Sequence, residues 1–190
     1  MTDYFDDDVD PEGMFSNEEL TQLIDRNVSM ICQEIGAGIK GEVVPRIWIA
    51  AISGDEKKEH MILINELPDT MPGRMQLMRT AGYTFGKQGE GTPLAVIFVC
   101  SALMTKYTPG ESIRIPSQSP NRQEIVLVSA YTFDMRASAK LIYVDRDPDD
   151  NLLFLYSSNE GEHESIISPL LQMFMMGFVE SLMDRNARNN

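Results

Sequence analysis

The longest connection expected in the folded part of the chain, residues 107–123, carries side chains suited to binding a ligand. The candidates for such a site are two arginines and two of its three serines: Arg114, Ser117, Ser119 and Arg122. A guanidinium group binds a carboxylate or phosphate through two parallel hydrogen bonds, and long loops often bind ligands. The pattern is therefore compatible with an anion site over residues 108–123. The alternative, which we favour, is a proline-stiffened connection with Arg122 paired to Glu124 or to another carboxylate.

Acidic residues alternate just after an expected strand, as they do at the start of a calcium-binding EF-hand loop. Asp145, Asp147 and Asp149 take these alternate positions. However, Asp150 stands where that loop needs glycine, and Tyr156 stands where it needs its final glutamate. The segment therefore predicts a hairpin turn exposed to solvent.

A second group of acids lies before the last expected helix and includes one of the two histidines: Glu160, Glu162, His163 and Glu164. The zinc motif HExxH fails because Ile167 takes the place of its second histidine. Acids before a helix are also favoured by the positive end of its dipole. His60 has no partner that the sequence identifies, and no nucleotide-binding glycine loop follows a strand. We expect no metal and no cofactor, and the catalytic residues, if there are any, are unknown.

The charge distribution argues against nucleic acid as a partner. The formal net charge is −13, and the first 25 residues hold nine acids and no base. The rest of the chain is only mildly acidic, and its lysines and arginines are scattered, whereas phosphate contacts need them clustered.

Three features predict a cytoplasmic protein that does not enter a membrane. The first residues lack the basic and apolar segments of a secretion signal. Cys32 and Cys100 are far apart and are expected to be small buried apolar residues, without a disulfide or a zinc site. No apolar run approaches the roughly 20 residues of a membrane span.

The chain divides into an arm, one domain and a short tail. Residues 1–14 are acidic and contain Pro11 and Gly13, which predicts a disordered arm. Order is expected from Phe15, because Ser16 and Glu19 form a capping box at a helix start and Phe15 can pack on Leu20. The domain is expected to cover residues 15–186, with a flexible tail at residues 187–190.

The hydrophobic pattern predicts an α+β fold in the order α-β-β-α-β-β-β-β-α, with three helices and a mainly antiparallel sheet of about six strands. Residues 43–53 and 60–66 are expected to form a hairpin. Residues 94–104 and 125–133 are apolar at odd and even positions alike, so these strands should be central and covered on both faces. Gly82 and Gly86 weaken the prediction for the second half of the helix that begins near Pro72.

The last helix carries apolar residues on both of its sides. At 100° per residue its first stripe comprises Leu171, Phe174, Met175, Phe178 and Leu182. Methionines recur on the opposite side beside polar residues, and the candidates for an interface there are Met173, Met176, Glu180 and Met183. Methionine is flexible and polarizable and suits adaptable contacts. This side is expected to be buried within the monomer, to form a homodimer, or to bind a different protein partner.

These patterns lead to one functional hypothesis and one alternative. The hypothesis is a small cytoplasmic, non-catalytic module that works by association, through self-assembly or as an accessory subunit. The alternative is a small anion-binding protein, or an enzyme, that uses the loop 108–123.

Overall fold

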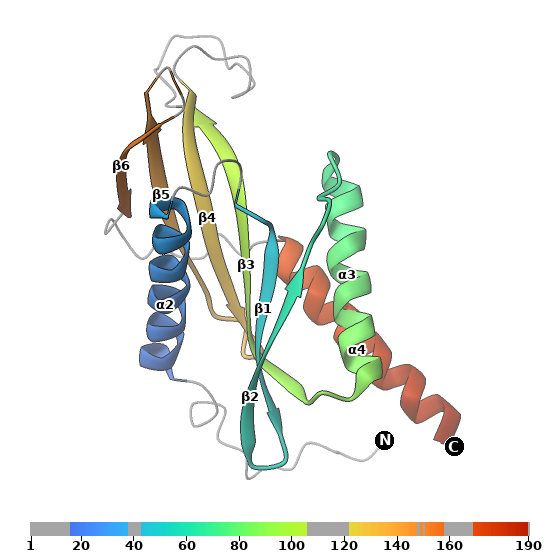
Figure 1. The fold of residues 1–190 in the computed structure, drawn as a ribbon. Helices are drawn as coiled ribbons and strands as arrows, with labels where there is room; N and C mark the ends of the chain where they lie inside the picture. The colour runs from blue at the N-terminus through green and yellow to red at the C-terminus, as the bar shows by residue number, and fades with distance from the viewer. Residues whose placement is uncertain are drawn as a thin grey trace.

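The computed structural model describes residues 16–37, 43–105, 122–147, 149, 151–157 and 169–189. Within these ranges three helices and a six-stranded sheet follow the predicted order, which is thereby confirmed (Figure 1). The elements are α2 (Asn17–Gly36), β1 (Arg46–Ser53), β2 (Glu56–Leu63), α3 (Met71–Gln88), β3 (Thr92–Thr105), β4 (Arg122–Thr132), β5 (Ala137–Arg146), β6 (Leu152–Ser157) and α4 (Pro169–Asn189).

The sheet has the strand order β2-β1-β3-β4-β5-β6, and each pair of neighbours is antiparallel. The two strands at its centre are β3 and β4, which pair from Ala95 opposite Thr132 to Thr105 opposite Arg122. These are the two strands that are apolar at odd and even positions alike, a pattern that predicted a central position, so that prediction is confirmed.

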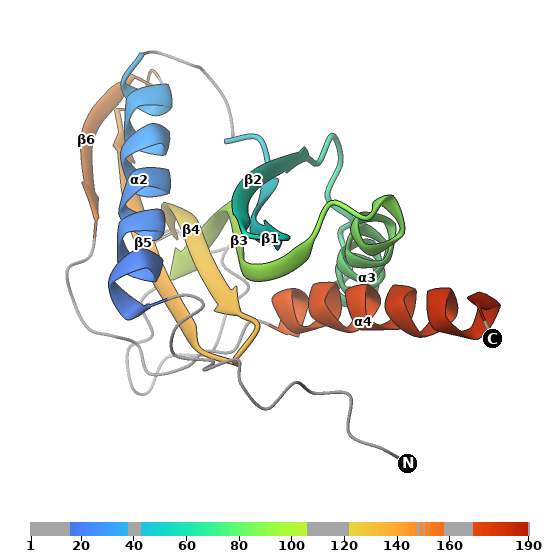
Figure 2. The ribbon, with the colours of Figure 1, turned by 90° about the horizontal axis from the view of Figure 1, so that it is seen from below.

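The helices cover the sheet from both sides, which gives three layers. α2 lies against one face, and α3 and α4 lie against the other (Figures 1 and 2). Successive side chains of β3 alternate between the two cores: Ala95, Ile97 and Val99 pack toward α2, and Val96, Phe98 and Cys100 pack toward α3 and α4. Because both faces are buried, apolar residues stand at every position of this strand from Leu94 to Cys100.

The second strand begins earlier than the sequence predicts. It starts at Glu56, directly after the turn at Gly54 and Asp55, whereas the hydrophobic pattern placed its start at His60. β2 is an edge strand with exposed lysines at positions 57 and 58, and charged side chains suit an edge because they face water and oppose unwanted pairing. Hydrophobicity alone therefore understates its length.

The start of α2 is fixed by the predicted capping box. The Ser16 hydroxyl accepts a hydrogen bond from the Glu19 amide at 3.1 Å, and the Ser16 amide donates to the Glu19 carboxylate at 2.7 Å. Both bonds satisfy amides that have no partner inside the helix. The expected packing of Phe15 on Leu20 and the expected disorder of the arm lie outside the described residues.

α3 and α4 cross at a contact made by small residues. A Cβ on Gly177 would lie 1.9 Å from the backbone oxygen of Arg79, and one on Gly82 would lie 1.9 Å from the backbone oxygen of Phe174. Gly86 faces Ser181 in the same way. These glycines allow the two backbones to approach closely, so they are packing positions of the helix pair and not breaks in it.

Candidate docking surface

A groove lies between α4 and the turn that joins β4 to β5, and we call it the α4 groove. Its volume is about 590 Å³, and its lining is mostly apolar: Tyr131, Phe133, Met135, Gln172, Met175, Met176, Val179, Glu180 and Met183. Five of these side chains remain well exposed: Phe133 (47%), Met135 (73%), Met176 (51%), Val179 (38%) and Met183 (65%). Large apolar side chains from two elements thus meet at one surface within the part of the chain that the structure describes.

The helical wall of the groove follows from the spacing of residues along α4. Met176, Val179 and Met183 are three or four residues apart, so they share one side of the helix. Gly177 and Ser181 lie against α3, and Phe174 and Phe178 are buried under the sheet. Two sides of α4 are therefore occupied by the protein's own core, and the methionine side faces the groove.

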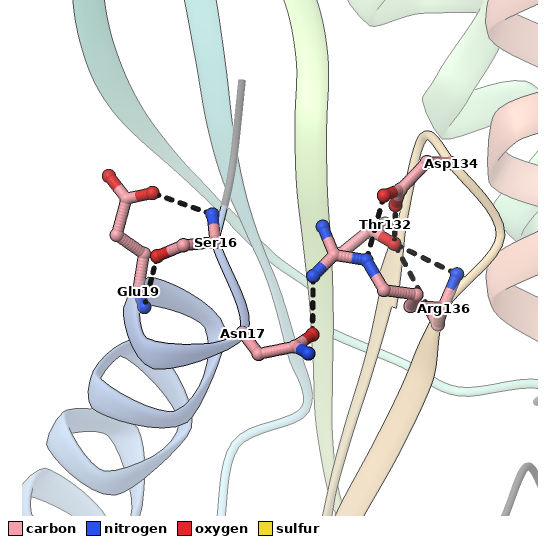
Figure 3. Close-up of polar contacts among 6 residues, drawn as sticks. All are labelled: Ser16, Asn17, Glu19, Thr132, Asp134 and Arg136. Atoms are coloured by element: carbon pink, nitrogen blue, oxygen red, sulfur yellow. Dashed lines mark hydrogen bonds and ion pairs between the residues drawn. The ribbon is translucent and has the colours of Figure 1, made fainter. Parts of the chain in front are cut away.

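The second wall is the turn at residues 132–136. Polar contacts hold it in shape, and we call it the braced turn (Figure 3). The Thr132 hydroxyl accepts from the Arg136 amide at 2.9 Å and donates to the Asp134 carboxylate. Arg136 Nε donates to Asp134 Oδ2 at 2.7 Å. Met135 has a φ of 68°, in the left-handed region. This costly backbone conformation is held by the surrounding bonds and leaves the Phe133 and Met135 side chains exposed.

The bonds to Asp134 also set its charge state. Burial raises the pKa of the Asp134 carboxyl, but hydrogen bonds from Thr132 and Arg136 and the positive charge of Arg136 lower it, and the net result lies below its ordinary value. The ionised form is the one that accepts these hydrogen bonds. These contacts therefore favour the ionised form of Asp134.

The first turn of α2 lies beside this wall. The Arg136 guanidinium group donates a hydrogen bond to the Asn17 side-chain oxygen, and Figure 3 shows Ser16 and Asn17 next to the braced turn. Arg136 thus connects the start of the helix to the turn that carries Phe133 and Met135. Ser16, the first described residue, consequently lies beside the turn that forms one wall of the α4 groove.

The single charged residue in the groove lining is Glu180, and its charge is matched. Arg79 Nε donates to Glu180 Oε2 at 2.9 Å, and a second bond joins the same two groups. The hydrogen bond to Glu180 raises the pKa of Arg79 further. A ligand of the groove would therefore meet little net charge.

The structure places the predicted interface residues in two environments. Met176, Glu180 and Met183 line the groove, whereas Met173 is partly buried against the core between the sheet, α3 and α4. The sequence analysis did not identify Phe133 and Met135. A possible signal was the presence of two large apolar residues in a turn where polar residues are usual.

Most of the predicted anion site lies outside the described residues. This holds for Arg114, Ser117 and Ser119, while Arg122 is exposed at the start of β4. Glu124, the proposed partner of Arg122, accepts a hydrogen bond from Arg146 Nε at 3.0 Å. The anion site remains a prediction.

The acidic segment after β5 forms the predicted hairpin turn. Asp147 accepts hydrogen bonds from the amides of Asp149 and Asn151 at 2.9 and 2.8 Å, and the Asn151 side chain also donates to it. These bonds, first of all the one from the Asn151 side chain, lower the pKa of Asp147. Its carboxylate is thus occupied by the backbone of the turn. The cluster at residues 160–164 lies outside the described residues.

The two cysteines and the histidine of the described ranges lie against apolar or aromatic side chains. Burial raises the pKa of the Cys100 thiol to about 11 and also raises that of Cys32, so both favour the unreactive neutral form. The His60 ring meets the Phe85 ring edge to face at 5.3 Å. Across these ranges no group of three or more histidine, cysteine or acidic residues could hold a metal ion.

No helix in the described part of the chain is long and apolar enough to cross a membrane. The groove's role must be argued from its geometry, because no family model, curated protein or solved structure matches this chain.

Proposed function

We propose that the protein is a cytoplasmic, non-catalytic association module whose α4 groove binds a second copy of the chain. One observation carries the proposal: exposed methionine, valine and phenylalanine side chains from α4 and from the β4–β5 turn converge on one groove. Contiguous apolar surfaces of this kind often mark interaction sites. Methionine adds the ability to adjust to an opposing surface.

The shape and charge of this surface suit contact between identical copies. Met176 and Met183 protrude from α4, while the space between the helix and the turn is recessed. One surface thus offers both a projection and a recess, as a two-fold symmetric interface requires. Its single charge, Glu180, is matched by Arg79, so two copies that each carry −13 can meet here without placing unpaired acids together.

The size of the surface predicts a weak and reversible dimer. If each of the five exposed side chains offers roughly 100 Å², the total is on the order of 500 Å². Stable complexes bury roughly 800 Å² per partner. Repulsion between acidic chains weakens the contact further.

The compartment is inferred from the cysteines. Both described thiols are free, and both are wholly or partly buried. The chain therefore gains nothing from an oxidising compartment, which is compatible with the reducing cytoplasm.

The proposal is tested by placing one charge in the groove. Met176→Glu should remove the dimer, because association would bury an unpaired carboxylate, and the folded monomer should persist. Met71→Glu is the matched control: Met71 is 53% exposed against 51% for Met176, and it lies outside the groove lining.

The two variants are compared with the unchanged chain by light scattering over a range of concentrations and by circular dichroism. We expect the mass to rise with concentration for the unchanged chain and for Met71→Glu, and to stay at that of a monomer for Met176→Glu. A native spectrum with an unchanged mass profile in Met176→Glu would refute the α4 groove as the interface.

A further inference from the structure

The chain N-terminal to α2 starts beside the α4 groove and has the composition to enter it. We propose that residues 1–15 of the same chain occupy the groove and compete there with the second copy. This inference rests on the proposed function, because it takes the groove to be a docking surface. It adds a regulatory role for the N-terminal segment.

The N-terminal segment joins α2 beside one wall of the groove. Ser16 caps α2, and Asn17 is bonded to Arg136 in the braced turn (Figure 3). Phe133 and Met135 of that turn form one wall of the groove. The segment that precedes Ser16 is therefore anchored at the groove wall before it makes any contact of its own.

The segment is long compared with the methionine side of α4. Fifteen extended residues reach up to about 50 Å, and the eleven steps along the chain from Phe5 to Ser16 reach up to about 35 Å. Along α4, Met176 and Met183 are separated by a rise of about 10 Å. The reach from Phe5 to Ser16 thus exceeds the length of the methionine side of α4 about threefold.

The chemistry of the segment matches the groove. Large apolar residues alternate with acids: Tyr4, Phe5, Val9, Met14 and Phe15 stand among Asp3, Asp6, Asp7, Asp8, Asp10 and Glu12. Aromatic side chains fit an apolar groove with flexible methionine walls and also gain from contact with sulfur. The acids can remain in water, because the groove offers no unmatched charge to draw them in.

Tethering explains how a groove of this size can be covered. An area too small for a strong complex between separate proteins suffices when the ligand is attached nearby, because the effective concentration is on the order of 1 mM. The many acids keep the contact weak and the segment in exchange between bound and free. The acidic arm predicted from the sequence is then a reversible cover for the groove.

The first experiment changes only the anchors of the segment. The double variant Tyr4→Ser with Phe5→Ser keeps the length and charge of the full chain, and ¹³C-methyl spectra of its methionines report on the groove. We expect the methyl signals of Met135, Met176 and Met183 to shift, and that of Met71 to stay in place. Asp7→Glu with Asp8→Glu is the control: it keeps the charge of the segment and both aromatic anchors, and should leave all four signals unchanged.

The second experiment measures competition by light scattering. If the segment covers the groove in about nine molecules of ten, the Tyr4→Ser, Phe5→Ser chain should dimerise at least tenfold more tightly. A synthetic peptide of residues 1–15 should reverse this gain, and it should not bind a chain that also carries Met176→Glu.

The outcomes separate this inference from the proposed function. Unchanged methyl signals and unchanged dimerisation in the Tyr4→Ser, Phe5→Ser chain would overturn the cover, even if Met176→Glu still removed the dimer. If Met176→Glu has no effect on mass but the methyl signals shift, the segment docks and dimerisation through the groove is refuted.

Discussion

Two sides of α4 show how one helix can make two different kinds of surface. Gly177 faces α3, where backbone meets backbone and no added carbon fits. Met176 and Met183 face the α4 groove, where both side chains are more than half exposed. The first side is complementary to a single partner, and the second can adapt to several.

The difference shows what each residue type contributes. Glycine removes the side chain and fixes the distance between two helices, so its contact tolerates no change of volume. Methionine supplies a long flexible side chain, so its contact tolerates changes of shape but depends on remaining uncharged. Stability is therefore expected to depend on the glycine side, and association on the methionine side.

The largest predicted effect is on the glycine side. In an exposed helix Gly→Ala stabilises by up to about 1 kcal/mol. Gly177→Ala should do the opposite and lower the free energy of unfolding by about 3 kcal/mol, because the new carbon would overlap the Arg79 backbone oxygen. Denaturant unfolding measures the change.

The control is Gly36→Ala at the end of α2, where an added Cβ would have nothing within 4 Å. This variant should be neutral or slightly more stable than the unchanged chain. Equal stability of Gly177→Ala and Gly36→Ala would show that the close crossing of α3 and α4 is wrong.

The second prediction concerns the helix start beside the groove. Ser16→Ala should cost about 1 kcal/mol, because the Glu19 amide loses its acceptor at 3.1 Å and the capping box opens. Thr70→Ala, at the start of α3, removes a single bond of 3.2 Å to the Gly73 amide and should cost less. Thermal unfolding of the two variants gives the ranking, and the reverse order would contradict the role of the capping box.

What could be predicted from the sequence depended on local pattern. The capping box of Ser16 and Glu19 involves residues three apart, so the helix start could be predicted. Apolar residues stand at both odd and even positions of β3 and β4, which reflects burial on both faces, and the central position of these strands followed from that pattern. The start of β2 could not be found in this way, because its edge position allows charged residues.

Contacts between distant segments could not be predicted from the sequence. Gly82 weakened the prediction for α3, because glycine is a poor helix former. The contact that explains this glycine is made with the backbone of Phe174, which lies far along the chain. The methionine side of α4 was recognised, but Phe133 and Met135 were not, since nothing local in a turn reveals which helix lies opposite it. One wall of the candidate site was therefore predicted and the other was not.

The third prediction is a pH dependence of the braced turn. The pKa of Asp134 is lower in the folded chain than its ordinary value of about 4. The contacts of its carboxylate therefore stabilise the fold fully at pH values above about 4. The contribution is lost as the pH falls through the lowered pKa of the folded state. Because the carboxylate is partly exposed, we expect about 0.5 kcal/mol.

Asp134→Asn provides the comparison for this pH dependence. The difference in unfolding free energy between the unchanged chain and Asp134→Asn should shrink as the pH is lowered from 6 toward 3. A difference that stays constant over this range would show that the charge of Asp134 does not support the turn.

The smallest predicted effect is on the methionine side, and it completes the comparison of the two sides of α4. Met183→Gln should change the free energy of unfolding by about 0.5 kcal/mol or less, because this side chain is 65% exposed and its replacement meets water. The same substitution at Met78, which is fully buried on α3, should cost several kcal/mol because it buries an amide among apolar side chains. Denaturant midpoints of the two variants measure both effects. A large loss of stability in Met183→Gln would place this side of α4 inside the core of the monomer and remove the structural basis for a docking groove.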